Sequence, residues 1–267
     1  MPNKDRKLLF FDIDGTLITD DGKRVMPEST KQAIELARKN GHLTFINSGR
    51  VLCNIEDFIK SPGFDGYVCG CGTYISLNDE VLLHNKLTHE HCNRVAKMCR
   101  KTNMRAVFEY TDFTSYDNKV PVDEHKELLQ YFMAMGRKMV DDIDSEEFIY
   151  DKFTAWYSEA DSDIAIFKQE IAVDYQCIDR ESNFFEIVPN GFSKATGIKY
   201  LMDYLGVPLQ NIFVFGDSNN DIEMLKYVPN SIAMGKCTDE VKATASYMTD
   251  TVENDGIYKA MRHFGII

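Results

Sequence analysis

The sequence predicts an α/β fold in which an open, mostly parallel β-sheet is interrupted by a second unit of α+β type. Two observations indicate the parallel sheet: short apolar runs alternate with helical patterns in the first third of the chain, and the same alternation returns in the last third. A third observation indicates the second unit, because the pattern changes between about residue 84 and residue 185. We therefore expect an α/β core domain over residues 1–84 and 186–267, with an α+β domain inserted over residues 85–185.

The first apolar run, Leu8 to Phe11, leads directly into Asp12, Ile13, Asp14 and Gly15. Such a run suits a strand buried on both faces of a parallel sheet, and ligands bind at the carboxyl ends of such strands. The two carboxylates are separated by one residue and repel each other, so they favour a bridging cation or a proton on one of them. An ordinary strand-to-turn exit is the alternative, because Asp and Gly are common in turns.

A helix is predicted over residues 31–40, since residues 27–30 include residue types typical of a helix start and Gly41 follows. The next apolar strand ends in Ser48, Gly49 and Arg50, which completes a parallel strand–helix–strand unit. Ser48 could cap a helix that starts near Val51. It could also help to bind a phosphate, and the two roles are compatible.

A third strand, Gly66 to Cys69, runs into Gly70-Cys71-Gly72. This is not a dinucleotide-binding loop, because Ile75 occupies the position of the third glycine, and we expect a tight turn. In the insertion we expect two helices, at residues 90–101 and 124–135. We also expect three strands, at residues 105–110, 153–157 and 172–175, and a solvated acidic loop at residues 141–147.

The α/β pattern returns near Phe184. A helix is predicted from Lys194, with Ser193 as a possible N-cap and Gly206 as its stop; the apolar positions Ile198, Leu201, Met202 and Leu205 form one face. A lysine in this position is usually solvated, but here it follows a turn at the end of a strand.

A strongly apolar strand, Asn211 to Phe215, is followed by Gly216 and then by Asp217, Asn220 and Asp221. This is the second carboxylate cluster at a strand end. A calcium-binding EF-hand loop is excluded, because Ile222 and Val228 stand where that loop needs Gly and Glu. Two short strands near residues 231–234 and 245–249 would complete the sheet.

Composition is that of an ordinary globular protein, with 44% hydrophobic and 27% charged residues among 267. The formal net charge of −12 argues against nucleic acid and anionic membranes as partners, since both need clustered Lys and Arg. No apolar run approaches the roughly 20 residues of a membrane span, and the N-terminus does not have the pattern of a signal peptide. The seven cysteines contain no C-x-x-C pair and suggest buried thiols in a reduced compartment. We expect a cytoplasmic protein that is a monomer or a weak homodimer.

Four motifs, at Asp12–Leu17, Ser48–Arg50, Lys194 and Gly216–Asp221, stand in the order found in the haloacid dehalogenase-like hydrolases. The chain resembles this family, and within it the Cof-type sugar-phosphate phosphatases, which implies a Rossmann-like core with an α+β cap. Asn47 and Ser48 depart from the usual Ala-Thr of the second motif, and Cys71 stands where an Asn is common.

The resemblance implies roles for these residues. Asp12 would attack phosphorus and form an aspartyl-phosphate, while Asp14 would act as general acid and base. Mg²⁺ would be bound by Asp12, the backbone carbonyl of Asp14 and Asp217. Phosphate would be held by Ser48, Gly49 and Lys194, and the catalytic Lys194 would also neutralise the nucleophile Asp12. Arg50, Asn220 and Asp221 would stand in supporting positions.

The chemistry of a phosphate monoester points the same way. An anionic nucleophile can approach a dianionic phosphate only with a hard cation between them, and Mg²⁺ is such a cation. Three alternatives remain open. A phosphomutase or phosphotransferase would share every motif. A non-catalytic sensor of a phosphorylated ligand should have lost Asp12 or Asp14, which are both present, and a calcium-binding structural protein is disfavoured by the failed EF-hand pattern. The expected partner is a small phosphorylated metabolite, and Trp156, Arg180 and Asn183 in the insertion are candidates for contacting its leaving group.

Overall fold

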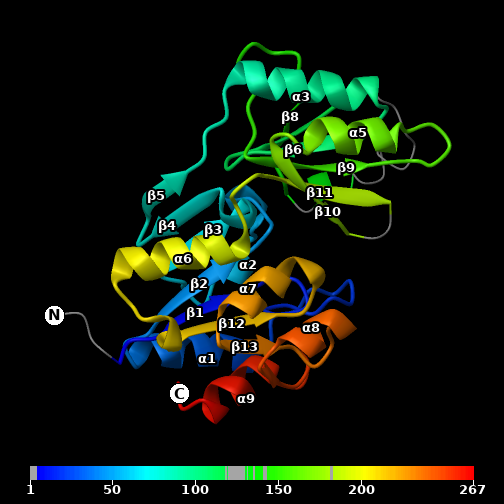
Figure 1. Cartoon of the computed structure of the whole chain (residues 1–267). Coiled ribbons are helices and arrows are strands. Elements are labelled where there is room, and N and C mark those ends of the chain that lie inside the picture. The colour runs from blue at the N-terminus through cyan, green and yellow to red at the C-terminus, as the bar shows by residue number, and fades with distance from the viewer. Residues whose placement is uncertain are drawn as a thin grey trace. The chain divides into compact units, whose positions relative to one another are not determined.

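The computed structural model describes residues 5–117, 119, 130, 132–134, 136–140, 143–180 and 183–267. The chain divides into two compact units, each drawn in Figure 1. The first unit comprises Met1–Arg50, Ile55–Leu83 and Phe192–Ile267, and the second comprises Val51–Asn54 and His84–Gly191. We describe each unit separately.

The first unit is built on an eight-stranded sheet with the order β14-β13-β12-β1-β2-β3-β4-β5. The strands from β14 to β3 run parallel to one another, and β4 runs antiparallel to β3. The strands are β1 (Leu8–Phe11), β2 (Leu43–Asn47), β3 (Gly66–Cys69), β4 (Tyr74–Leu77), β5 (Glu80–His84), β12 (Ile212–Gly216), β13 (Asn230–Ala233) and β14 (Tyr247–Met248).

Helices cover both faces of this sheet (Figure 1). They are α1 (Glu28–Lys39), α2 (Asp57–Lys60), α6 (Lys194–Leu205), α7 (Ile222–Tyr227), α8 (Asp239–Thr244) and α9 (Gly256–His263). One apolar core joins α6, α7 and α8 to the side chains of Leu8 and Phe10 on β1. Neighbouring strand residues alternate between faces, so Leu9 and Phe11 point to the opposite face of the sheet.

The strand order places a topological switch point at β1. The chain passes from β1 to β2 and β3 on one side, and from β12 to β13 and β14 on the other. At such a point the loops after two neighbouring parallel strands separate, which leaves room for a ligand at their carboxyl ends. The residues that follow β1, β2 and β12 are those of three of the four motifs.

The second unit contains a six-stranded sheet within its described part, with the order β10-β11-β9-β6-β7-β8. The strands are β6 (Arg105–Glu109), β7 (Thr114–Tyr116), β8 (Met139–Val140), β9 (Lys152–Trp156), β10 (Tyr175–Asp179) and β11 (Phe184–Pro189). Its described helices include α3 (His89–Lys101) and α5 (Ile164–Ile171). The core of this unit packs α3 and α5 against alternate residues of the sheet, among them Phe108, Phe153 and Phe185.

The predicted fold class is confirmed: a parallel-rich sheet with a separate α+β unit. The helix at Lys194 has the predicted limits, because the Ser193 hydroxyl accepts a hydrogen bond from the Thr196 amide and Gly206 takes a left-handed conformation with φ 63°. No helix in the described part of the chain has the length and apolarity that crossing a membrane requires.

Other predictions about individual elements were wrong. The predicted strand at residues 172–175 is mostly a turn after α5, and β10 begins only at Tyr175. The side chain of Asp163 caps α5 by accepting a hydrogen bond from the Ile166 amide, and Phe167 and Ile171 bury its apolar face. No α-helix begins near Val51, where a 3₁₀ turn spans Leu52–Asn54. The predicted helix at residues 124–135 and the start of the acidic loop at Asp141 lie largely outside the described residues.

The predicted return to the core at residue 186 also needs correction. β11, which contains Glu186, pairs antiparallel with β9 and β10 of the second unit. The second unit therefore extends to Gly191. An apolar run such as Phe184–Pro189 has the same pattern in either sheet, so pairing decides where it belongs.

Candidate active site

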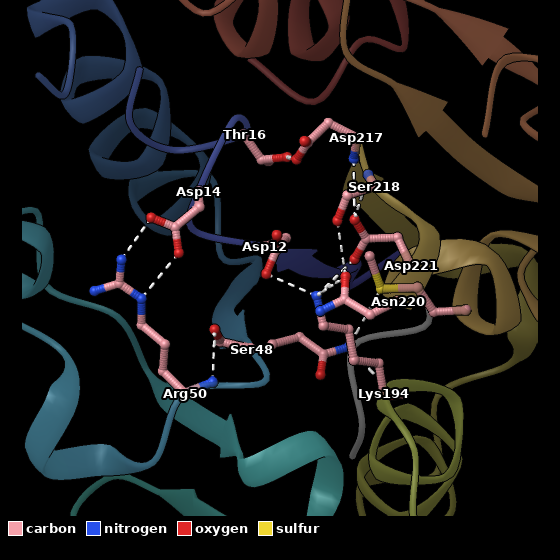
Figure 2. A network of polar contacts seen from close by, with 12 residues as sticks. Asp12, Asp14, Thr16, Ser48, Arg50, Lys194, Asp217, Ser218, Asn220 and Asp221 are labelled. Carbon is pink, nitrogen blue, oxygen red and sulfur yellow. Dashed lines mark hydrogen bonds and ion pairs between the residues drawn. The ribbon is translucent and has the colours of Figure 1, made fainter. Parts of the chain in front are cut away.

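Asp12 and Lys194 form a buried ion pair at the carboxyl end of β1. Lys194 Nζ donates a hydrogen bond of 2.7 Å to Asp12 Oδ1, although the two residues are 182 positions apart in the sequence. Lys194 is 1% exposed and Asp12 is 5% exposed. The helix start at Ser193 places Lys194 in the first turn of α6, from which its side chain reaches β1 (Figure 2).

The same ammonium group holds the loop after β12. Lys194 Nζ donates to Asp221 Oδ1 at 2.6 Å and to Asn220 Oδ1 at 3.3 Å. The other oxygen of Asp221, Oδ2, accepts the backbone N–H groups of Asp217 and Ser218 at 3.0 and 3.1 Å. Asp221 is 0% exposed, and both oxygens of its carboxylate accept hydrogen bonds inside the protein. It thereby fixes the loop that carries Asp217.

Asp217 lies opposite Asp12, on the loop after β12. Its Oδ1 accepts a hydrogen bond of 2.9 Å from Thr16 Oγ1, which connects the two motif loops (Figure 2). Gly15 has φ 76°, and a Cβ atom there would lie 2.4 Å from Asp217 Oδ2. Only glycine at this position allows the Asp217 carboxylate to approach the turn after β1.

Burial and charge change the acidities of these groups. Burial raises the pKa of Asp12 to about 7, even though the Lys194 ammonium acts in the opposite direction. Burial, followed by the charges of Asp12 and Asp221, raises the pKa of Asp217 to about 8. Burial would lower the pKa of Lys194, but the carboxylates of Asp12 and Asp221 raise it well above its usual value. The lysine is therefore a permanent cation among three carboxyl groups.

Three of these carboxyl groups could hold a metal ion. Ligand oxygens of Asp12, Asp217 and Asp221 all lie within 4.8 Å of one another. Oxygen donors of this kind suit a hard cation such as Mg²⁺. Burial is the main cause of the raised pKa values of Asp12 and Asp217, the neighbouring carboxylates add to it, and a bound cation would lower both pKa values. The residues present therefore fit Mg²⁺.

Asp14 has quite different surroundings. Its side chain is 50% exposed and forms a two-point ion pair with Arg50, in which Nε donates to Oδ2 at 2.9 Å and Nη2 donates to Oδ1 at 2.5 Å. The third nitrogen of the guanidinium, Nη1, donates to Glu56 Oε2 at 2.9 Å. Both oxygens of Asp14 thus face Arg50, so this side chain is not among the clustered metal-ligand candidates (Figure 2).

The end of β2 contributes Ser48 and the two residues after it. The Ser48 hydroxyl oxygen accepts the Arg50 backbone N–H at 3.2 Å, and the Ser48 side chain is buried. Gly49, partly exposed, forms the turn between them. Asn47, just before Ser48, donates from Nδ2 to the Lys194 carbonyl at 3.2 Å, and this bond ties β2 to the start of α6.

At the carboxyl ends of the central strands β1, β2 and β12, the structure brings together Asp12, Ser48, Lys194, Asp217, Asn220 and Asp221, with Asp14 and Arg50 beside them (Figure 2). Sequence reasoning assigned no role to Thr16, Asn47 or Glu56. Thr16 lies inside a motif that was recognised, so it could have been found as a polar residue beside the predicted site. Asn47 stands in the second motif as a departure from its usual Ala, but its bond to the Lys194 carbonyl could not be read from that. Glu56 carries no comparable signal, because its partners are known only once the chain has folded.

Comparison with known proteins identifies the family. The sequence profile of the haloacid dehalogenase-like hydrolases matches residues 9–261. One relative is the 5-amino-6-(5-phospho-D-ribitylamino)uracil phosphatase YcsE of Bacillus subtilis (strain 168), 28% identical over 265 residues, which are 97% of this chain and 96% of the relative. A solved structure, the HAD subclass IIB sugar phosphatase BT4131, is 29% identical, with a TM-score of 0.83 over 98% of this chain and 100% of its own. The match spans nearly the whole sequence and both carboxylate clusters, and the protein belongs to the haloacid dehalogenase-like hydrolase family.

Proposed function

We propose that the protein is a Mg²⁺-dependent phosphatase that hydrolyses small phosphate monoesters, such as sugar phosphates, through an aspartyl-phosphate on Asp12. The observation that carries this proposal is the buried Asp12 carboxyl at a strand end, with Lys194 Nζ 2.7 Å from Oδ1 and the carboxyl groups of Asp217 and Asp221 nearby. A carboxylate held by a fixed ammonium in a cation-binding cluster suits nucleophilic attack on phosphorus.

In the first step, Asp12 forms a bond to phosphorus and the bond to the leaving alcohol oxygen breaks. Asp14 donates a proton to that oxygen, so that an alcohol leaves rather than an alkoxide. In the second step, Asp14 takes a proton from water, which attacks the phosphorus, releases inorganic phosphate and regenerates the Asp12 carboxylate. The half-exposed side chain of Asp14 suits a group that must exchange protons with both substrate and water.

The other residues bind charge and orient groups. Lys194, together with the Ser48 hydroxyl and the Gly49 amide, would bind the phosphoryl oxygens, while Asn220 and Asp221 hold Lys194 in place. The ligands of Mg²⁺ would be the side chains of Asp12 and Asp217 and the backbone carbonyl of Asp14. When bound, Mg²⁺ supplies positive charge that lets an anionic nucleophile approach a dianionic phosphate.

The substrate class rests on the compounds named for the relatives. BT4131 is described as a sugar phosphatase, and YcsE acts on a phosphorylated ribityl chain. Both descriptions concern phosphate esters of polyhydroxylated alkyl groups, and we extend this class to the present chain. In the second unit, Trp156 stacks on Phe184 with 5.2 Å between ring centroids, and Arg180 Nη1 lies 3.6 Å from Glu186 Oε2. We retain Trp156, Arg180 and Asn183 as candidates for recognising the leaving group.

A panel of phosphorylated metabolites tests the proposal. Phosphate release from sugar phosphates, polyol phosphates and nucleotides would be measured with Mg²⁺, and again after metal stripping in excess EDTA. We expect release from several sugar or polyol phosphates only when Mg²⁺ is present. Full activity in EDTA, or no release from any monoester with Mg²⁺, would contradict the proposal.

A further inference from the structure

A four-residue segment, Val51–Asn54, clusters with the second unit although the residues on both sides of it belong to the first. It follows Arg50 directly and is followed by Ile55 and Glu56. Arg50 and Glu56 are joined by an ion pair, with Nη1 of Arg50 2.9 Å from Oε2 of Glu56. The chain thus leaves the first unit after Arg50 and returns to it at Ile55, next to Glu56, which is the ion-pair partner of Arg50.

The segment is anchored to the second unit by buried hydrogen bonds. Asn54 is 2% exposed, and its Nδ2 donates to Glu109 Oε1 at 3.2 Å and to Thr114 Oγ1 at 3.3 Å. The Cys53 backbone N–H donates to the Thr111 carbonyl at 3.0 Å. These contacts hold the side chain of Asn54 and the backbone of Cys53. The position of Asn54 therefore depends on the sheet of the second unit.

The anchor belongs to a network of buried ion pairs. Glu109, on β6, pairs with Lys152 of β9 at 3.0 Å, and Lys152 also pairs with Glu186 of β11 at 2.6 Å. All three charged residues are buried and lie on adjacent strands. Breaking one member of such a buried network leaves a charge without compensation, so the network resists local rearrangement. A displacement of the anchor would therefore reach Val51–Asn54, which is bonded to it through Asn54.

The other end of the segment leads to Asp14. The guanidinium of Arg50 binds both oxygens of the Asp14 carboxylate, while Glu56 accepts from Arg50 and also from Arg24, whose Nη1 is 2.6 Å from Glu56 Oε1. Between these two ends the chain is compact, because the Asn54 N–H donates to the Val51 carbonyl at 3.0 Å. A short, tightly turned connection transmits displacement rather than absorbing it.

We propose that Val51–Asn54 couples the second unit to the orientation of the Asp14 side chain, and that Asn54 is a positioning residue for proton transfer to the leaving group. Through its bonds to Glu109 and Thr114, Asn54 fixes the backbone between Arg50 and Glu56, and Arg50 in turn fixes Asp14. The inference rests on the proposed role of Asp14 as general acid. The alternative is that Asn54 only satisfies buried polar groups, in which case its loss would cost stability alone.

Two aryl phosphates of nearly the same shape separate these alternatives. Phenyl phosphate has a basic leaving group that needs a proton, whereas p-nitrophenyl phosphate has a leaving group that departs without one. In the full-length enzyme with Mg²⁺, Asn54→Ala should lower kcat for phenyl phosphate by roughly 10- to 10²-fold, the cost of a small misplacement of a reacting group. The kcat for p-nitrophenyl phosphate should fall much less.

Two further variants serve as controls. Tyr150→Phe removes another buried hydrogen bond of the second unit, the 2.7 Å bond between Tyr150 and Tyr175, which involves neither Asn54 nor its partners Glu109 and Thr114. It should leave the ratio of the two rates unchanged even if it lowers the melting temperature as much as Asn54→Ala does. Thr114→Val keeps the shape of the anchor but removes one partner of Asn54, and it should shift the ratio in the same direction by a smaller factor.

A double-mutant comparison tests whether Asn54 acts through Arg50. If Asn54 acts through Arg50, Asn54→Ala should shift the ratio in the wild-type background and should add nothing in an Arg50→Ala background. Suppose that Asp14→Asn changes the ratio of the two rates but that neither Asn54→Ala nor Thr114→Val does. This result would overturn the proposed coupling and leave the proposed function intact. If the wild-type enzyme shows no Mg²⁺-dependent hydrolysis, or if Asp14→Asn leaves the ratio unchanged, the proposed function fails and the coupling fails with it.

Discussion

The surroundings of Asp12 and Asp14, two residues apart on the same loop, differ in burial and in the partner of each carboxyl group. Asp12 is buried beside the ammonium of Lys194, which is itself held by Asp221. Asp14 is half exposed and faces the guanidinium of Arg50, whose neighbouring segment belongs to the second unit. The difference suits two kinds of work: a nucleophile needs a fixed position and no competing water, whereas a proton carrier needs access to substrate and solvent.

The largest expected effect comes from removing the carboxylate of Asp12, which tests its proposed role as nucleophile. Asp12→Asn keeps the shape of the side chain but removes the proposed nucleophile, and we expect turnover to fall to background on every substrate. The variant should stay folded, because it removes a buried charge rather than adding one. Steady-state kinetics with Mg²⁺ and a thermal melt check both parts, and wild-type rates would contradict the covalent route.

Lys194→Met tests whether the ammonium is needed to keep the carboxyl groups together. It should abolish turnover and lower the free energy of unfolding by about 3–5 kcal/mol, because Asp12 and Asp221 lose their shared buried partner. Urea unfolding of the metal-free variant measures the loss. Lys199→Met, which removes an exposed ion pair with Asp203, is the matched control and should cost less than about 1 kcal/mol.

Asp14→Asn should separate the role of Asp14 from that of Asp12, because it should mainly slow substrates whose leaving group needs a proton. We expect kcat for an alkyl phosphate such as glucose 6-phosphate to fall by roughly 10²- to 10⁴-fold, the usual contribution of a general acid or base. The loss on p-nitrophenyl phosphate should be much smaller. Equal losses on the two substrates would argue against a role in leaving-group protonation.

The smallest expected effect concerns pH and metal binding. The folded-state pKa values of Asp12 and Asp217, about 7 and 8, lie above the ordinary 3.8, so the metal-free fold favours their protonated forms. Their stabilising contribution is present below about pH 4 and is lost as the pH rises through 7 and 8. Mg²⁺ needs the ionised carboxylates, and the rise in melting temperature that it produces should be larger at about pH 8 than at about pH 5.5. A rise that is equal or larger at the lower pH would contradict this assignment.

The sequence predicted those parts of the fold that depend on local pattern. The helix from Lys194 to Leu205 was predicted with its limits because Ser193 and Gly206 mark them. The apolar runs predicted β1, β2, β3 and β12, since strands buried on both faces have a continuous apolar pattern. The strands β4 and β5 were missed, because their short mixed sequences carry no such signal.

Contacts between distant parts of the chain could not be predicted in this way. Resemblance to a family placed Lys194 near Asp12, but no spacing in the sequence implies contact between residues 182 positions apart. The same holds for Glu186, whose strand pairs with the second unit rather than the first. The anchoring of Asn54 on Glu109 also depends on tertiary structure alone, and Asn54 was given no role from the sequence.

The central claim, covalent catalysis by Asp12, is tested most directly by trapping the intermediate. The wild-type enzyme and the Asp14→Asn variant would be mixed with p-nitrophenyl phosphate and Mg²⁺, quenched in acid within one turnover, and analysed by mass spectrometry. We predict a gain of one phosphoryl group on the peptide that contains Asp12, and no gain in Asp12→Asn. A wild-type enzyme that turns over rapidly without any such adduct, together with an Asp12→Asn variant that remains active, would contradict the account.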